Sequence, residues 1–168
     1  MRPTAVAPLT IVCFLLALPA TASAAVHVSF SHPERYRDAG LYAYEATADD
    51  RLLGEIRRHL ERLGERKLAR DQTLSVEVLD IDLAGRYEPW NFPRNDVRVM
   101  QDITWPRMRV RYVLEEQGKV LARGEELIVD MNYLGQPSAY PSGDRLRYEK
   151  RMLDDWFQSR IVERGAPR

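Results

Sequence analysis

Two aspartates in one apolar segment have the clearest potential for chemistry. Asp80 and Asp82 lie two positions apart, so on a β-strand their carboxylates would project from the same face. Together with Asp96, Asp102 or Asp130 they could surround Ca²⁺ or Mg²⁺, which prefer carboxylate oxygens. Calcium loops usually concentrate more oxygen ligands within about a dozen residues. We therefore favour the alternative, in which these acids pair with arginines at the end of a strand.

The segment after this strand contains candidate binding residues. It interleaves guanidinium groups with aromatic rings: Arg86, Tyr87, Trp90 and Arg94. Long loops in compact domains are often functional, and such side chains can stack on a sugar or pair with anions. We predict a binding site here, although we favour a packing role in which Tyr87 to Trp90 covers the last helix at Trp156.

A basic stripe alternates with apolar residues in the segment 106–114. Arg107, Arg109 and Arg111 would share one strand face and could hold a phosphate or a lipid head group. Glu125 and Glu126 are expected across a hairpin from them. We therefore favour a solvated face of salt bridges.

Other catalytic patterns have little support in this sequence. The chain has three histidines, and no serine lies in a nucleophile elbow. There is no glycine-rich phosphate loop and no zinc-ligand spacing. We predict no catalytic residue and no cofactor.

The elements that must position these residues follow from hydrophobic periodicity. Strands are predicted at 26–30, 74–83, 106–114 and 120–130, with a short strand at 97–100, and helices at 47–64 and 144–161. Apolar residues alternate from Leu74 to Val78, but the phase reverses at Leu79. Such a reversal predicts a β-bulge near Val78–Leu79.

The first helix should begin at Thr47 and end at Gly64. Its apolar face is formed by Leu52, Ile56, Leu60 and Leu63. His59 lies at the margin of that face, and we interpret it as a packed histidine because no second ligand follows at helical spacing.

The last helix should be buried on two sides. Ser142 is its expected cap. Its two apolar rows are Leu146, Leu153 and Phe157, and Tyr148, Met152 and Trp156. These rows cover more than half of the circumference, which predicts contact with both the sheet and a loop.

A hairpin should join the last two strands. Glu116–Gly118 is typical of a three-residue loop, and this register would place Arg109 opposite Glu125. A second irregularity is expected at Gly124. The element order β-α-β-β-β-α predicts an α+β two-layer sandwich, in which two helices cover one face of a four-stranded, mostly antiparallel sheet.

Residues 1–24 have the features of a signal peptide. Arg2 precedes an apolar run at 9–20, and Ala22-Ser-Ala24 supplies small residues for cleavage after Ala24, with cleavage after Ala25 as the alternative. The run is too short for a transmembrane helix, which needs about 20 apolar residues. We therefore expect a single domain at 25–168, located in the periplasm, with no transmembrane segment after cleavage.

The charge balance does not indicate a nucleic-acid partner. Lysine and arginine together number 25, as do aspartate and glutamate. A protein that binds nucleic acid through phosphates usually has a basic surplus.

Several stretches together resemble a known family. They are Asp80-Ile-Asp-Leu-Ala-Gly85, Glu88-Pro-Trp90, Asp96-Val-Arg-Val99, Asp102-Ile-Thr-Trp-Pro-Arg107, Asp130-Met-Asn-Tyr133 and Glu149-Lys-Arg-Met-Leu-Asp-Asp-Trp-Phe157. The family consists of small secreted proteins from Gram-negative bacteria and is classified as a domain of unknown function. The resemblance spans 28–157 and implies export to the periplasm, without implying any catalytic residue.

The predicted function is therefore a non-catalytic binding or accessory module of the cell envelope. Its partner would be an envelope protein, a lipid or a glycan, bound through the loops after the second and fourth main strands. The alternative is a metal-dependent enzyme centred on Asp80 and Asp82.

Overall fold

The computed structural model describes residues 24–40, 48–88 and 97–163. The strands are β1 (Ala25–Phe30), β2 (Gln72–Asp82), β3 (Arg86–Tyr87), β4 (Arg98–Val99), β5 (Arg107–Glu116) and β6 (Lys119–Val129). The helices are α1 (Asp50–Lys67) and α2 (Arg147–Trp156), with a 3-10 turn, η1 (Pro33–Arg35), and a π-helical segment, η3 (Phe157–Val162).

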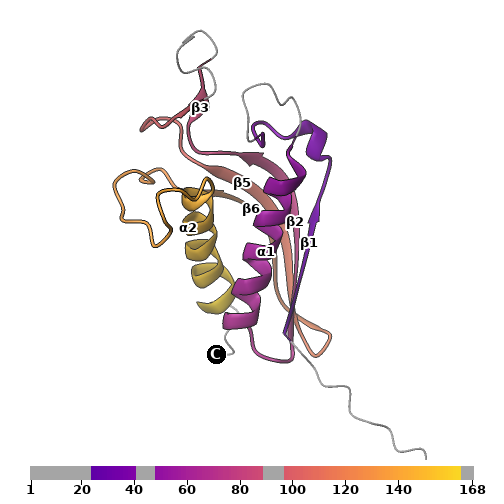
Figure 1. Cartoon of the computed structure of the whole chain (residues 1–168). Coiled ribbons are helices and arrows are strands. Elements are labelled where there is room, and N and C mark those ends of the chain that lie inside the picture. The colour runs from indigo at the N-terminus through magenta and orange to yellow at the C-terminus, as the bar shows by residue number, and fades with distance from the viewer. Residues whose placement is uncertain (1–23, 41–47, 89–96, 164–168) are drawn as a thin grey trace, which may run out of the picture.

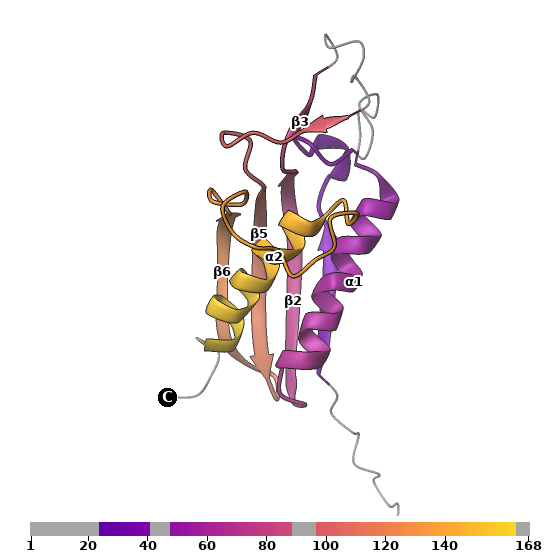
Figure 2. The same ribbon diagram turned by 60° about the vertical axis from the view of Figure 1, so that its left-hand side comes forward.

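Four strands form the main sheet, in the order β1-β2-β5-β6. β1 pairs with β2 in parallel, and the other two pairings are antiparallel. Parallel neighbours need a crossover connection, which α1 provides. Figure 2 shows α1 and α2 on the same face of the sheet. The predicted α+β two-layer architecture with a mostly antiparallel sheet is confirmed.

The predicted bulge in β2 is present. The pairing of β2 with β5 shifts between Val78 and Asp80. Val78 and Ile81 are both fully buried, although three positions separate them. The bulge therefore keeps both halves of β2 facing the helices, as the phase reversal requires.

The limits of α1 differ from the prediction. Asp49 is the N-cap, and its side chain accepts hydrogen bonds from the backbone amides of Arg51 (2.6 Å) and Leu52 (3.2 Å). Thr47 lies outside the described residues. The helix continues past Gly64 to Lys67, so Gly64 is not its end. A Cβ at Gly64 would lie 2.1 Å from Cγ2 of Val26, so this glycine instead lets α1 approach β1 closely.

The β5–β6 hairpin differs from the prediction in three ways. Gln117 and Gly118 form a two-residue turn with φ of 51° and 79°, a geometry that matches strand twist. Arg109 pairs with Leu127, while Arg111 pairs with Glu125. The register shift lies between Leu114 and Glu115, opposite 120–122, rather than at Gly124. The tighter turn and the earlier bulge together move the register by two residues.

The last helix is buried on two sides, as predicted. Leu153 and Phe157 are fully buried in the main core. On another side, the ring of Tyr148 packs edge-on against Tyr133 in the segment after β6, with centroids 4.8 Å apart. Ser142 is not the cap, because Leu146 occupies the N-cap position and its amide donates to Asp144 Oδ1 at 2.9 Å.

None of the helices in the described part of the chain combines the length and apolar character that a membrane span requires.

Candidate functional site

The segments after β2 and β6 meet at one end of the main sheet (Figure 1). There Ala84, Tyr133 and Tyr148 form a small second core, against which Met100 and Trp105 pack. The two loops that were predicted to bind a partner are therefore neighbours, and both contact the first turns of α2.

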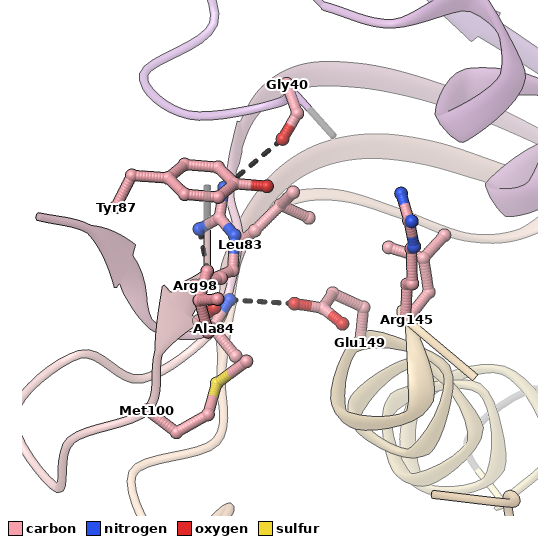
Figure 3. A pocket seen from close by; sticks show the side chains of 10 residues that line it. Gly40, Leu83, Ala84, Tyr87, Arg98, Met100, Arg145 and Glu149 are labelled. Atoms are coloured by element: carbon pink, nitrogen blue, oxygen red, sulfur yellow. Dashed lines mark hydrogen bonds between the residues drawn. The ribbon is translucent and has the colours of Figure 1, made fainter. Parts of the chain in front are cut away.

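A cavity of about 300 Å³ lies between the β3–β4 hairpin and the start of α2 (Figure 3). Its described lining residues are Gly40, Leu83, Ala84, Tyr87, Val97, Arg98, Met100, Arg145, Leu146 and Glu149. Most of these side chains are apolar, and a few polar groups lie among them. Such a composition is typical of sites that hold small ligands.

Gly85 allows the hairpin to fold against the end of β2. Its φ is +73°, and a Cβ there would lie 2.6 Å from the carbonyl oxygen of Val99. Its amide donates to the carbonyl of Thr104 at 2.8 Å. Only glycine combines this conformation with so close an approach.

Arg98 connects three segments that are distant in sequence. Its terminal nitrogens donate to both carboxylate oxygens of Asp38 at 2.8 Å, and to the carbonyls of Gly40 (3.2 Å) and Gly85 (3.0 Å). Its guanidinium lies 4.6 Å from the ring centroid of Tyr87. Burial opposes ionisation, but the hydrogen bonds and charge of Asp38 outweigh it and raise the pKa of Arg98.

Glu149 is the most unusual group of the cavity. Its side chain comes from α2, and Oε1 accepts a hydrogen bond from the amide of Ala84 at 2.8 Å (Figure 3). Within the described structure, Oε2 is buried and has no hydrogen-bond partner. Burial raises the pKa of Glu149, although the Ala84 amide and the charge of Arg98 act in the opposite direction. A buried carboxyl with one unsatisfied oxygen is a common feature of functional sites.

The substitution Glu149→Gln should change how stability depends on pH. The pKa of Glu149 is raised in the folded state above its ordinary value of 4.5. The contribution of protonated Glu149 to the free energy of unfolding is therefore fully present below about pH 4.5. It is lost as the pH rises through the folded-state pKa. Glutamine cannot ionise, so the free energy of unfolding of Glu149→Gln should rise relative to that of the wild type as the pH increases from acidic to alkaline.

Urea unfolding of both proteins at pH 4, 6 and 8 measures this effect. Both proteins share all other titrating groups, so the contributions of those groups cancel when the two unfolding free energies are subtracted. Asp155→Asn, on an exposed side of α2, is a matched control that should follow the wild type. A constant difference between the wild type and Glu149→Gln at all three pH values would contradict the prediction.

Two of the four predicted binding residues lie in the described structure. Tyr87 lines the cavity, whereas Arg86 lines a separate hollow with Asp82 and Arg107. Trp90 and Arg94 lie outside the described residues.

The predicted cover over Trp156 is not formed by Tyr87. Tyr87 shares the cavity with Leu146 and Glu149, at the start of α2. Trp156 lies at the other end of that helix and packs edge-on against Tyr112, with centroids 5.7 Å apart. Tyr87 therefore lies near the start of α2, across the cavity from Glu149.

The aspartates of β2 contact arginines. Asp80 accepts a hydrogen bond from the amide of Arg37 at 3.0 Å. Asp82 pairs with Arg107 and lies 3.8 Å from Arg37. These contacts support the arginine-paired interpretation of this strand end.

The other candidate aspartates do not join them. Asp130 pairs with Arg151, Asp102 is exposed, and Asp96 lies outside the described residues. Across 24–40, 48–88 and 97–163, no group of three or more histidine, cysteine, aspartate or glutamate side chains is placed to hold a metal ion.

The basic stripe is a face of ion pairs, as we favoured. Arg111 pairs with Glu77 (2.6 Å) and Glu125 (3.0 Å), and Arg109 lies 3.7 Å from Glu125. Glu126 does not take part. It faces the helices, where it accepts from Trp156 Nε1 at 3.3 Å, because successive strand residues point to opposite faces and Glu125 already faces the arginines.

His59 is a packed histidine, as predicted. It is buried, and its Nε2 lies 2.9 Å from Oδ1 of Asp154. The hydroxyl of Tyr140 donates to the other oxygen of Asp154 at 2.5 Å. Burial would raise the pKa of Asp154, but these two hydrogen bonds outweigh it and lower that pKa. The network connects α1, α2 and the segment after β6.

Neither Arg98 nor Glu149 was among the binding residues predicted from the sequence. Glu149 did leave a signal, because it lies three residues after Leu146 and four before Leu153, within an apolar row of the helix. A charged residue in such a row is an informative departure from the pattern. Arg98 left no such signal, since its partner Asp38 is 60 positions away.

The fold and the site define an α+β protein with a ligand-sized cavity at the loop end of its sheet. The model of the family described as "Protein of unknown function (DUF3016)" matches residues 24–159. The chain therefore belongs to this family, in agreement with the resemblance found in its sequence. Comparisons with curated proteins and with solved structures found no match.

Proposed function

We propose that the chain is a secreted, periplasmic binding module that holds a small ligand in the cavity beside Glu149. The observation that carries this proposal is the cavity itself. Its volume of about 300 Å³ is at the lower end of the range for ligand sites, roughly 300–1,000 Å³. Its mainly apolar lining with few polar groups supports recognition of a compact, mostly apolar molecule.

The arrangement of charges supports binding rather than catalysis. General acid–base chemistry needs titratable groups that can exchange protons with a substrate. Glu149 is the one acid among the described lining residues, and Arg98 is occupied by Asp38 and by carbonyl groups. The described lining therefore offers positioning groups without a paired acid and base.

A fluorescent dye that binds apolar cavities tests this function. N-phenylnaphthylamine should bind the wild type at about one dye per chain. Val97→Trp, which adds an indole at the cavity wall, should weaken binding at least tenfold by occupying the space. Val120→Trp is the matched control, because Val120 on β6 is similarly exposed (46% against 50% for Val97) and does not line the cavity.

The two tryptophan variants give opposite expectations. Equal loss of dye binding in both, or no loss in either, would exclude the cavity as the binding site. Thermal unfolding of each variant verifies that the fold is retained.

The periplasmic location is supported by the signal-peptide features of residues 1–24. Expression of the full chain in a Gram-negative host should yield a periplasmic protein whose mass corresponds to a start at Ala25. The double substitution Ala22→Asp and Ala24→Asp should block cleavage, because signal peptidase needs small residues there. Recovery of the wild type from the cytoplasm with Met1 attached would overturn this part of the proposal.

A further inference from the structure

The two oxygens of Glu149 have different surroundings. Oε1 accepts the Ala84 amide at 2.8 Å, whereas Oε2 is buried and lacks a partner within the described structure. Both belong to a residue that lines the cavity. A buried polar atom without a partner is costly. Because Oε2 has almost no accessible surface in this conformation, a ligand in the cavity would satisfy it after a small turn of the Glu149 side chain.

The charged groups around Glu149 act on its ionisation in opposite directions. Arg98 on β4 attracts a negative charge, but its guanidinium is paired with both oxygens of Asp38. Asp144, before α2, repels a negative charge and is itself held by Lys150 of α2 at 2.6 Å.

Two further groups face the same cavity. Arg145 and Tyr87 line it together with Glu149. Desolvation is the largest influence on Glu149 and raises its pKa, so these neighbours do not reverse the preference for a neutral carboxylic acid.

The neutral form places the proton on the unsatisfied oxygen. Oε1 accepts from the Ala84 amide, and the carbonyl oxygen of a carboxylic acid is a better acceptor than its hydroxyl oxygen, so we assign Oε1 as the carbonyl oxygen. The proton is then on Oε2, which becomes a hydrogen-bond donor facing no acceptor. A ligand that supplies an acceptor oxygen would complete this pair.

The rest of the cavity defines the remainder of the ligand. Leu83, Val97 and Met100 offer apolar contacts, which favour an apolar body. The guanidinium groups of Arg98 and Arg145 disfavour a cation, and a carboxyl with a raised pKa disfavours an anion.

We infer that the cavity takes an uncharged, largely apolar molecule whose carbonyl oxygen accepts a hydrogen bond from Oε2 of Glu149. This inference rests on the proposed binding function and specifies the ligand class. Amides, esters and ketones share the required chemistry. The additional hydrogen bond should increase affinity about three- to tenfold, as expected for a neutral pair.

A pair of dyes separates carbonyl recognition from general apolar binding. Prodan is an uncharged aromatic ketone, whereas N-phenylnaphthylamine has no carbonyl group. The measured quantity is the ratio of their affinities. In Glu149→Gln this ratio should match the wild type at acidic pH, because glutamine keeps an acceptor for the Ala84 amide and offers an N–H at the other position. In Glu149→Leu the ratio should fall three- to tenfold in favour of N-phenylnaphthylamine.

A pH series tests the same inference without relying on the leucine variant. In the wild type, the preference for prodan should decrease as the pH rises through the folded-state pKa of Glu149, because the donated proton is lost. In Glu149→Gln the preference should stay constant.

The outcomes distinguish the inference from the proposed function. If N-phenylnaphthylamine binds in the cavity but the affinity ratio is the same in all three proteins and at every pH, the carbonyl inference is overturned while the binding function stands. If neither dye binds the wild type, the proposed function fails and the inference fails with it. A pH-dependent ratio that Glu149→Gln abolishes supports both.

Discussion

Arg98→Ala should lower the free energy of unfolding by about 3–5 kcal/mol, the usual cost of removing one partner from a buried ion pair. Arg98 is only 13% exposed, and its removal leaves the carboxylate of Asp38 without its bidentate partner. The carbonyls of Gly40 and Gly85 lose their donors as well. Urea unfolding followed by tryptophan fluorescence measures the change.

Two control variants separate geometry from charge. Arg98→Lys keeps the positive charge beside Asp38, but one ammonium cannot match the planar, two-nitrogen contact, so an intermediate loss is expected. Arg109→Ala removes a half-exposed arginine that lies 3.7 Å from Glu125, and it should cost at most about 1 kcal/mol. Equal effects for Arg98→Ala and Arg109→Ala would contradict the structural role of Arg98.

Arg151→Met should have an effect of similar size at the other side of α2. Arg151 is buried (7% exposed) and pairs with Asp130. It also donates to the carbonyls of Gln136 (2.8 Å) and Tyr133 (3.1 Å). Methionine fills a similar volume but leaves a buried carboxylate without its partner, so we expect a loss of about 3–5 kcal/mol. Amide hydrogen exchange in 131–143 should also accelerate, because Arg151 holds this segment against α2.

A double-mutant cycle with Asp130→Leu tests the cause of that loss. If the cost comes from an unpaired buried charge, the double variant should be more stable than Arg151→Met alone. Additive losses in the two single variants would instead indicate that Arg151 acts through its carbonyl contacts. Chemical denaturation and hydrogen exchange on all four proteins complete the cycle.

Arg98 and Arg151 together explain how a loop-rich end of the sheet stays ordered around a cavity. Each guanidinium serves one carboxylate and at least two backbone carbonyls. Backbone groups in buried irregular segments need such partners, because no strand or helix satisfies them. The contacts of Arg98 hold one wall of the cavity in place, whereas those of Arg151 hold the segment after β6 against α2.

Hydrophobic periodicity predicted the main strands and helices and the faces that they bury. The alternation in 108–114 predicts which residues of β5 face the core, and the phase reversal after Val78 predicts the bulge in β2. The width of the apolar surface on the last helix predicts its burial on two sides. These features depend on the period of a strand or a helix, which is local to each segment.

The end of helix α1 and the register of the β5–β6 pair depend on tertiary contacts. Helix α1 continues past Gly64, its predicted end, and this glycine instead allows close contact with Val26. The β5–β6 register moved by two residues because turn length and bulge position act together. Registers that differ by two residues leave the same side chains on each face of the sheet. The alternation of apolar and polar residues in each strand therefore could not distinguish them.

The candidate site was also decided by the tertiary structure. The sequence pointed to the segment after β2, and Tyr87 does line the cavity. The polar groups that characterise that cavity come from elsewhere: Arg98 meets Asp38 across 60 positions, and Glu149 meets Ala84 across 65. Whether a charged side chain is exposed, paired or buried with one oxygen unsatisfied depends on which distant segment packs over it. The position of Glu149 in an apolar row of α2 indicates its burial, but no periodic signal in the sequence identifies the distant segment that packs over it.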